Sequence, residues 1–323
     1  MHGLLVTLIT LVVAISVVFG WLFASYRKFT KNLPKPAYQY PRVRPELESS
    51  ADEEGWFAWI GHSTVYMNLF GVRILTDPVF SEKIGVSLLG LLRIGPKRHT
   101  APALKLDELS PVNVILLSHA HMDHLDLPSL RKLADPEIEV ITARGTSRLL
   151  RGMPFKGVYE LGESEEIVLS SGMKVKSIPV RHWGRRFPWN STYAWTGYSL
   201  EHQGRKAVFA GDTAMTQTFK ELSNDGPIDV MMMPIGAYSP DSFQTSHCTP
   251  EQAWEMFQDS GARWLIPIHH DTFVLSREPV KEPLQRLFAA AGSQQDRIVV
   301  REHGGIFRLQ GSVPEAAVAP SSL

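Results

Sequence analysis

The feature that most constrains the fold is a run of histidines and carboxylates directly behind a short apolar segment. Val112–Leu117 is rich in Val, Ile and Leu, which predicts a strand covered on both faces. The residues that follow bear closely spaced ligand-type side chains: His119, His121, Asp123 and His124. Neutral imidazole nitrogens and carboxylate oxygens are ligands of Zn²⁺ and similar ions. A metal-binding loop behind a core strand is therefore predicted here.

Three more residues of this kind stand just past apolar strands. They are His182, Asp212 and His269, after the predicted strands Val175–Val180, Lys206–Ala210 and Trp264–Ile268. Alone, each is as readily a capping Asp or a satisfied core His. Strand ends at one side of a sheet converge in space, so these side chains are expected to meet the first loop. The combined set exceeds what one tetrahedral ion uses and suits two ions that share a carboxylate.

The body of the chain alternates strands and helices, which predicts a large sheet system with helices outside. Further strands are predicted at Phe57–Ile60, Val65–Phe70, Val72–Leu75, Val140–Thr142 and Val230–Pro234, and helices at Leu127–Ala134, Pro250–Ser260 and Pro283–Ala291. Thr249 and Gln252 form a capping box at the second helix, and Gly261 ends it. Ile298–Arg301 and Gly305–Leu309 are predicted to form a hairpin.

Composition excludes several classes of protein. Lys+Arg and Asp+Glu are both 33, so the zero net charge argues against a nucleic-acid partner. A single cysteine, Cys248, excludes a disulfide framework and a Cys-rich zinc module. Its only near histidine is the neighbouring residue, which disfavours a thiol nucleophile. No Gly-x-Ser-x-Gly elbow or Walker-type phosphate loop occurs either.

The N-terminal region is predicted to be a membrane anchor. Leu4–Ala24 carries no charge and as a helix would span about 31 Å, close to the hydrocarbon core of a bilayer. Residues 1–25 are therefore predicted to be one transmembrane helix, rather than a cleaved signal peptide or a buried core helix. The basic flank at Arg27 and Lys28 places the body on the cytoplasmic side. A Pro-containing tether over 26–54, a single domain over 55–311 and a flexible tail over 312–323 complete the predicted organisation.

Taken in order, these residues resemble the metallo-β-lactamase superfamily, and more closely its branch of phospholipases D that hydrolyse N-acylphosphatidylethanolamine. Other matching motifs are Gly61–Thr64, Thr76–Phe80, Gly95–Arg98, Pro234–Tyr238, His247–Glu251 and Ile268–Phe273. The resemblance implies an α/β fold, the αββα sandwich. It assigns His119, His121 and His182 to one ion, and Asp123, His124 and His269 to a second, with Asp212 bridging. The motif frame favours His269 over its neighbour His270.

The resemblance also implies an activity. Two divalent ions, zinc by default with iron or manganese as alternatives, would supply a metal-bound hydroxide that attacks phosphorus or a carbonyl carbon. Asp123, Asp212 and His247 are the implied catalytic residues, and Asp126 the residue that buttresses a ligand. The candidates for substrate contact are His247, Tyr238, Trp183, Lys97 and Arg98.

Three functions stay open on this basis. The first is a membrane-anchored phosphodiesterase acting on N-acylated or similar phospholipids. The second is a lactone hydrolase that uses the same metal site. The third is a non-catalytic metal-binding membrane scaffold or sensor, against which the complete ligand set argues. The apolar stretch Ile84–Ile94 and the Arg- and Trp-containing segment Gly184–Gly197 are either lipid-contacting or packed, and a homo-oligomer is left open.

Overall fold

The computed structural model describes residues 2–47, 55–88, 92–109, 111–187 and 193–309. The chain divides into two compact units, residues 1–35 and 36–323, and each is described by itself. The predicted tail over 312–323 and the tether residues 48–54 lie outside the described residues.

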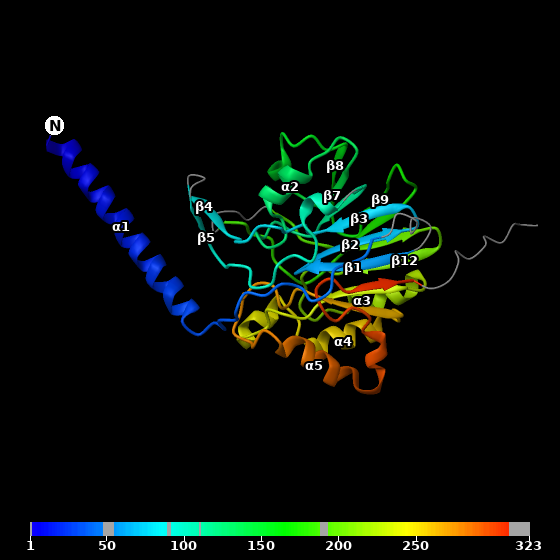
Figure 1. Cartoon of the computed structure of the whole chain (residues 1–323). Helices are drawn as coiled ribbons and strands as arrows, with labels where there is room; N and C mark the ends of the chain where they lie inside the picture. The colour runs from blue at the N-terminus through cyan, green and yellow to red at the C-terminus, as the bar shows by residue number, and fades with distance from the viewer. Residues whose placement is uncertain (1, 48–54, 89–91, 110, 188–192, 310–323) are drawn as a thin grey trace, which may run out of the picture. The chain divides into compact units, whose positions relative to one another are not determined.

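The first unit is the helix α1, His2–Thr30 (Figure 1). The prediction that this segment is a transmembrane anchor is wrong, since no helix among the described residues combines the length and apolarity that crossing a membrane requires. The single-pass localisation with a cytoplasmic body rested on that anchor and is wrong with it. Absence of charge is a weaker criterion than apolarity. Within the uncharged run, the hydroxyls of Thr7, Thr10 and Ser16 donate to backbone carbonyls one turn earlier.

The second unit is built on two sheets (Figure 1). The seven-stranded sheet has the order β15 (Ile306–Arg308), β1 (Trp56–Gly61), β2 (Thr64–Leu69), β3 (Val72–Thr76), β6 (Val114–Leu117), β7 (Glu139–Ala143) and β8 (Gly157–Leu161). The six-stranded sheet has the order β14 (Trp264–Ile268), β13 (Val230–Pro234), β12 (Arg205–Phe209), β11 (Gly197–His202), β10 (Lys174–Ile178) and β9 (Glu166–Val168). A separate short pair joins β4 (Val86–Leu88) to β5 (Leu92–Ile94).

Parallel pairing brings the functional loops to one edge of each sheet. In the first sheet β6 runs parallel to both β3 and β7. In the second, β13 runs parallel to both β12 and β14. The carboxyl ends of parallel strands lie at the same edge of a sheet. The loops after β3 and β6, and those after β12 and β14, are therefore grouped by the topology alone.

Helices cover the outer faces of the two sheets. Side chains from both sheets, such as Phe57, Tyr198 and Phe209, fill the core between them. The outer face of the first sheet packs on α2 (Leu127–Leu133). The outer face of the second packs on α3 (Thr218–Leu222), α4 (Pro250–Asp259) and α5 (Glu282–Ala291) (Figure 1). The predicted α/β sandwich with helices outside is confirmed.

Local signals placed the helix ends well, whereas the predicted C-terminal hairpin is wrong. The Thr249–Gln252 capping box is present at α4, and Gly261 adopts a positive φ of 69° just past its end. β15 instead pairs antiparallel with β1, placing Phe57 opposite Phe307. Ile298 forms a lone bridge to Leu265. Two neighbouring apolar runs indicate strands, but they do not show which strands pair. The partner of β15 is β1, which lies much earlier in the chain.

Part of the predicted tether is docked on this unit. The Gln39 backbone amide donates to His99 O at 2.8 Å, and the Ala101 amide donates to Gln39 O at 2.9 Å. The Gln39 side chain also donates to Thr100 Oγ1 at 2.8 Å. Residues 36–47 therefore include a segment held by ladder-type hydrogen bonds.

We predict that Thr249→Ala weakens the fold through α4. The Thr249 hydroxyl accepts from the Gln252 amide, and the Gln252 side chain accepts from the Thr249 amide. Losing such a cap costs about 1 kcal/mol, which lowers Tm by about 2 °C in a domain of this size. Differential scanning calorimetry measures this, with Thr249→Ser as the capping control. Equal Tm values for the alanine and serine variants would contradict the assignment.

Candidate metal centre

The loop after β6 folds into a tight turn that presents its side chains toward the second sheet. The amides of His124 and Leu125 both donate to His121 O, at 3.2 and 2.8 Å. His119 and His124 are fully buried, while His121 keeps some exposure. The turn therefore brings His119, His121, Asp123 and His124 of one short segment close together.

Three histidines converge into what we call the first ligand group: His119, His121 and His182. His119 Nε2 lies 2.7 Å and His182 Nε2 lies 3.3 Å from His121 Nδ1. The second nitrogen of His182, Nδ1, is directed at Ser246 O at 2.8 Å, which leaves its Nε2 free to bind a cation. Burial, with the like charges of the neighbouring histidines, holds the pKa of His119 well below its usual range. Neutral imidazoles are the form that ligates metal.

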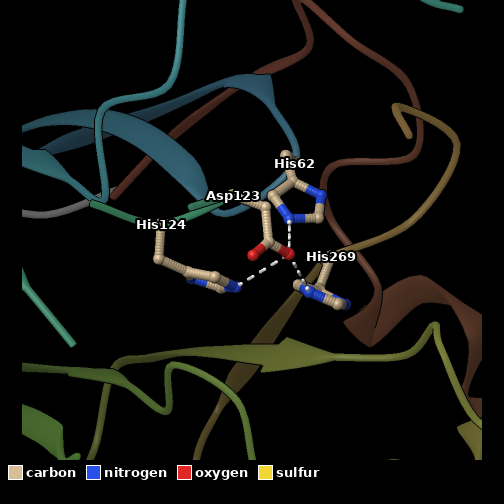
Figure 2. A group of neighbouring side chains, drawn as sticks. All are labelled: His62, Asp123, His124 and His269. Carbon is tan, nitrogen blue, oxygen red and sulfur yellow. Dashed lines mark hydrogen bonds and ion pairs between the residues drawn. The ribbon is translucent and has the colours of Figure 1, made fainter. Parts of the chain in front are cut away.

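Three more residues make the second ligand group: Asp123, His124 and His269. Asp123 Oδ2 lies 3.5 Å from His124 Nε2 and 3.5 Å from His269 Nε2 (Figure 2). His269 follows β14 and adopts a positive φ of 59°, which turns it into the site. The adjacent His270 instead stacks on Trp59, with ring centroids 4.6 Å apart. Between these two neighbouring histidines, the structure brings His269 to the group.

Asp212 lies beside both groups. Its Oδ2 is 3.1 Å from His124 Nε2 and 3.2 Å from His269 Nε2 in the second group. It is 3.8 Å from His182 Nε2 in the first. The whole predicted ligand set therefore meets at one place, with the Asp212 carboxylate in the middle.

The electrostatics of the centre favour a bound cation. Burial opposes the charge on Asp212, but His124 and His269 outweigh it and hold the pKa of the carboxyl well below its usual range. Burial likewise opposes the charge on His269, and the Asp212 and Asp123 carboxylates raise its pKa to about 9. Asp212 Oδ1 and His121 Nε2 are buried without a hydrogen-bond partner. Buried orphaned donors and acceptors are rare, and a metal ion fits them.

Asp77 is a functional residue to which the sequence reasoning gave no role. It follows β3, and its Oδ2 lies 2.7 Å from His124 Nδ1. The same oxygen accepts from Ser118 Oγ at 2.5 Å, and Ser118 Oγ lies 2.8 Å from His119 Nδ1. Asp77 therefore orients one histidine of each ligand group, directly or through Ser118.

Asp126, expected to buttress a ligand, has different partners. Its Oδ2 accepts from Ser81 Oγ at 2.6 Å and Ser129 Oγ at 2.5 Å, and Arg93 lies 3.5 Å from its Oδ1. These contacts join the end of the metal-binding loop to α2 through Ser129, to the segment after β3 through Ser81, and to β5 through Arg93. A strand-end Asp before a proline, as in Thr76-Asp77-Pro78, is the signal that could have found Asp77.

A cavity of about 330 Å³ opens onto the centre. Trp183 and His247 line it, together with His121, Asp123 and Asp212. The other three candidates for substrate contact have different partners. Lys97 pairs with Glu82 at 2.8 Å. The buried Arg98 guanidinium donates to the Thr100 carbonyl at 3.3 Å and stacks on Phe273, and Tyr238 donates to Glu282 at 2.8 Å.

Comparison with known proteins identifies the class. Residues 72–270 match the model of a family described as a beta-lactamase superfamily domain, so the chain belongs to that superfamily. N-acyl-phosphatidylethanolamine-hydrolyzing phospholipase D 1 of Caenorhabditis elegans is 31% identical over 286 residues, covering 82% of this chain and 79% of that protein. An uncharacterized protein of Mycobacterium tuberculosis is 32% identical over 273 residues, covering 82% and 72%.

Solved structures agree at the level of the fold. A possible metal-dependent hydrolase from Veillonella parvula superposes with a TM-score of 0.64 at 17% identity, covering 79% of this chain and 100% of that one. Fold, family and clustered ligands together make this chain a hydrolase of the metallo-β-lactamase fold. The resemblance stated from the sequence motifs is confirmed.

We predict that Asp77→Asn weakens metal binding about 10–100-fold. The carboxylate accepts at both oxygens, from His124 Nδ1 and Ser118 Oγ at Oδ2 and from the Ser118 amide at Oδ1, whereas the NH2 group of an amide cannot accept at one of these places. Zinc affinity is measured by competition with a chromogenic chelator. The matched control is Asp126→Asn, a buried carboxylate in the same region whose partners are Ser81 and Ser129. Equal loss in both variants would show that Asp77 has no special part in orienting the ligands.

We predict that Cys248 is chemically inert. It is 1% exposed, its Sγ lies 3.3 Å from Pro234 O, and burial raises the pKa of its thiol far above the usual value. Only a thiolate reacts readily, so iodoacetamide should modify this residue only after denaturation. Mass spectrometry of the native and unfolded protein tests this. Rapid labelling of the native protein would reopen a nucleophilic role for the thiol.

Proposed function

We propose that the protein is a phosphodiesterase of phospholipase D type, with two metal ions, acting on N-acylphosphatidylethanolamine or a closely similar lipid. The observation that carries this proposal is the position of Asp212 beside both ligand groups. A carboxylate flanked by two such groups suits two ions with a shared ligand. The name of the Caenorhabditis elegans relative supports the choice of substrate class.

The donor set fits zinc first, with iron or manganese as alternatives, because it consists of imidazoles and carboxylates. Divalent ions held there would lower the pKa of water and offset charge that develops on phosphate oxygens. The residues of this chain would contribute the rest. His119, His121 and His182 would hold one ion and the second ligand group the other, while Asp77 and Ser118 fix the rings.

The cavity suits an amphiphilic phosphate ester. It is lined both by metal-centre residues and by apolar side chains, among them Ile84, Met122, Trp183, Phe243 and Leu275. Arg185, an exposed cation, also lines it. Apolar walls with a few convergent polar groups are typical of ligand sites. We infer that the phosphodiester lies against the carboxylates and histidines, with acyl chains along the apolar wall.

His247 is assigned to the substrate side. Its Nε2 lies 3.5 Å from Asp212 Oδ2, and its Nδ1 is buried without a hydrogen-bond partner. It stands two residues before Thr249, the N-cap of α4, where backbone amides attract anions. An imidazole N–H at this place can donate to a phosphate oxygen. It can also deliver a proton to the leaving oxygen.

The reaction balances as hydrolysis of one phosphoric ester bond. The oxygen of water forms a bond to phosphorus, and the bond from phosphorus to the ethanolamine oxygen breaks. A proton from water ends on that leaving oxygen. The products are phosphatidic acid and N-acylethanolamine.

We predict that the zinc-loaded full chain cleaves N-acylphosphatidylethanolamine in mixed micelles, and that Asp212→Ala lowers this rate at least about 10³-fold. In ¹⁸O-labelled water the label should enter the phosphate of phosphatidic acid, which mass spectrometry reads directly. The control for folding is the Tm of each variant in the presence of excess zinc.

Two other outcomes would replace the proposal. Label in a carboxylate produced from a lactone, with no cleavage of the phospholipid, would make the protein a lactone hydrolase. Stable binding of metal with no turnover of phosphodiesters, lactones or esters would support a non-catalytic scaffold.

A further inference from the structure

His62 is a buried histidine beside the centre, and the proposed reaction gives it no part. It lies in the turn between β1 and β2, and its side chain is 1% exposed. Its Nε2 is 3.2 Å from Asp123 Oδ2 (Figure 2). Its ring lies against His269, with centroids 4.2 Å apart, and meets the edge of Phe273 at 5.2 Å.

The backbone at His62 is held in an uncommon conformation. Its φ is +56°, a region that residues with a side chain adopt only at a cost in energy. Three hydrogen bonds hold it there: its amide donates to Thr272 Oγ1 at 2.8 Å, and its carbonyl accepts from His269 N at 3.0 Å and Trp59 Nε1 at 2.8 Å. The turn is therefore bound to the loop that carries His269.

Packing alone does not account for a histidine here. A carboxylate oxygen only accepts hydrogen bonds, so the proton of the pair sits on His62 Nε2. The other nitrogen, Nδ1, is buried without a partner, which is destabilising. A phenyl ring would fill the same space between His269 and Phe273 without that cost. The contact that a histidine makes here and a phenylalanine could not is the hydrogen bond to Asp123.

We propose that His62 is a positioning residue for the second metal ion: by donating from Nε2 to Asp123 Oδ2, it fixes this carboxylate between His124 and His269. This rests on the proposed two-ion function and deepens it. His62 Nε2 belongs to a set of ligand-type atoms, with those of Asp123, His124 and His269, that all lie within 4.8 Å of one another. One lone pair of Oδ2 is occupied by the imidazole, and the oxygen keeps another for the ion. Outer partners of this kind typically set metal affinity by about 10–100-fold.

The test is stepwise zinc titration of the full-length protein against a chromogenic chelator, with zinc content measured after dialysis. The wild-type chain is expected to hold two ions. His62→Phe, which keeps the ring shape and removes the donor, should hold the first ion normally and bind the second about 10–100-fold more weakly. His62→Gln, whose amide N–H can still donate, should recover most of that affinity.

The matched control is His99→Phe. His99 is also buried, at 5% exposure, and its Nε2 has no partner, but its Nδ1 lies near Thr100 Oγ1 rather than a metal-centre residue. A role in packing alone would lower Tm without changing either zinc affinity. Unchanged affinity for the second ion in His62→Phe, or equal loss in the Gln and Phe variants, would overturn the proposal. A wild-type chain that binds one ion would instead refute the two-ion function, which keeps the two failures distinct.

Discussion

The charge of a buried carboxylate governs the whole centre. Asp212 is almost entirely removed from water, and an isolated carboxylate there would be very costly. In the protein by itself, the imidazoles of His124 and His269 offset this charge, and the Asp212 and Asp123 carboxylates in turn raise the pKa of His269 to about 9. A divalent cation meets the same need more directly. When it is present, the histidines no longer have to carry charge and are free to serve as neutral ligands.

The fold supplies this arrangement without specialised elements. Parallel strands in each sheet bring their carboxyl ends to one edge, so short loops behind β6, β10, β12 and β14 meet there. Asp77 and Ser118 then fix ring orientation from the first sheet. The ligands need precise placement, and rigid strand ends with fixed hydrogen-bond partners provide it.

Much of this was readable from sequence because the informative signals are local. Apolar runs followed by His or Asp located the candidate ligands that the structure brings together, and the α4 capping box located a helix start. What could not be read depends on distant partners. The sequence marks Asp77 as a strand-end residue, but its contact with His124 depends on the pairing of β3 with β6, which no local pattern shows. His62 lies in the motif Gly61–Thr64, but its contact with Asp123 is visible only in the folded chain, where its turn meets the loop of His269. The transmembrane prediction for α1 failed for a different reason: the absence of charged residues was taken as sufficient apolarity.

The two ligand groups draw residues from both sheets, because the β6 loop belongs to the seven-stranded sheet whereas His182, Asp212 and His269 belong to the six-stranded one. The centre therefore links the two sheets at this edge of the sandwich. Any motion that parts the sheets at this edge also pulls the ligands away from one another. At this edge, a loss of packing between the two sheets would therefore also be a loss of the metal-binding geometry.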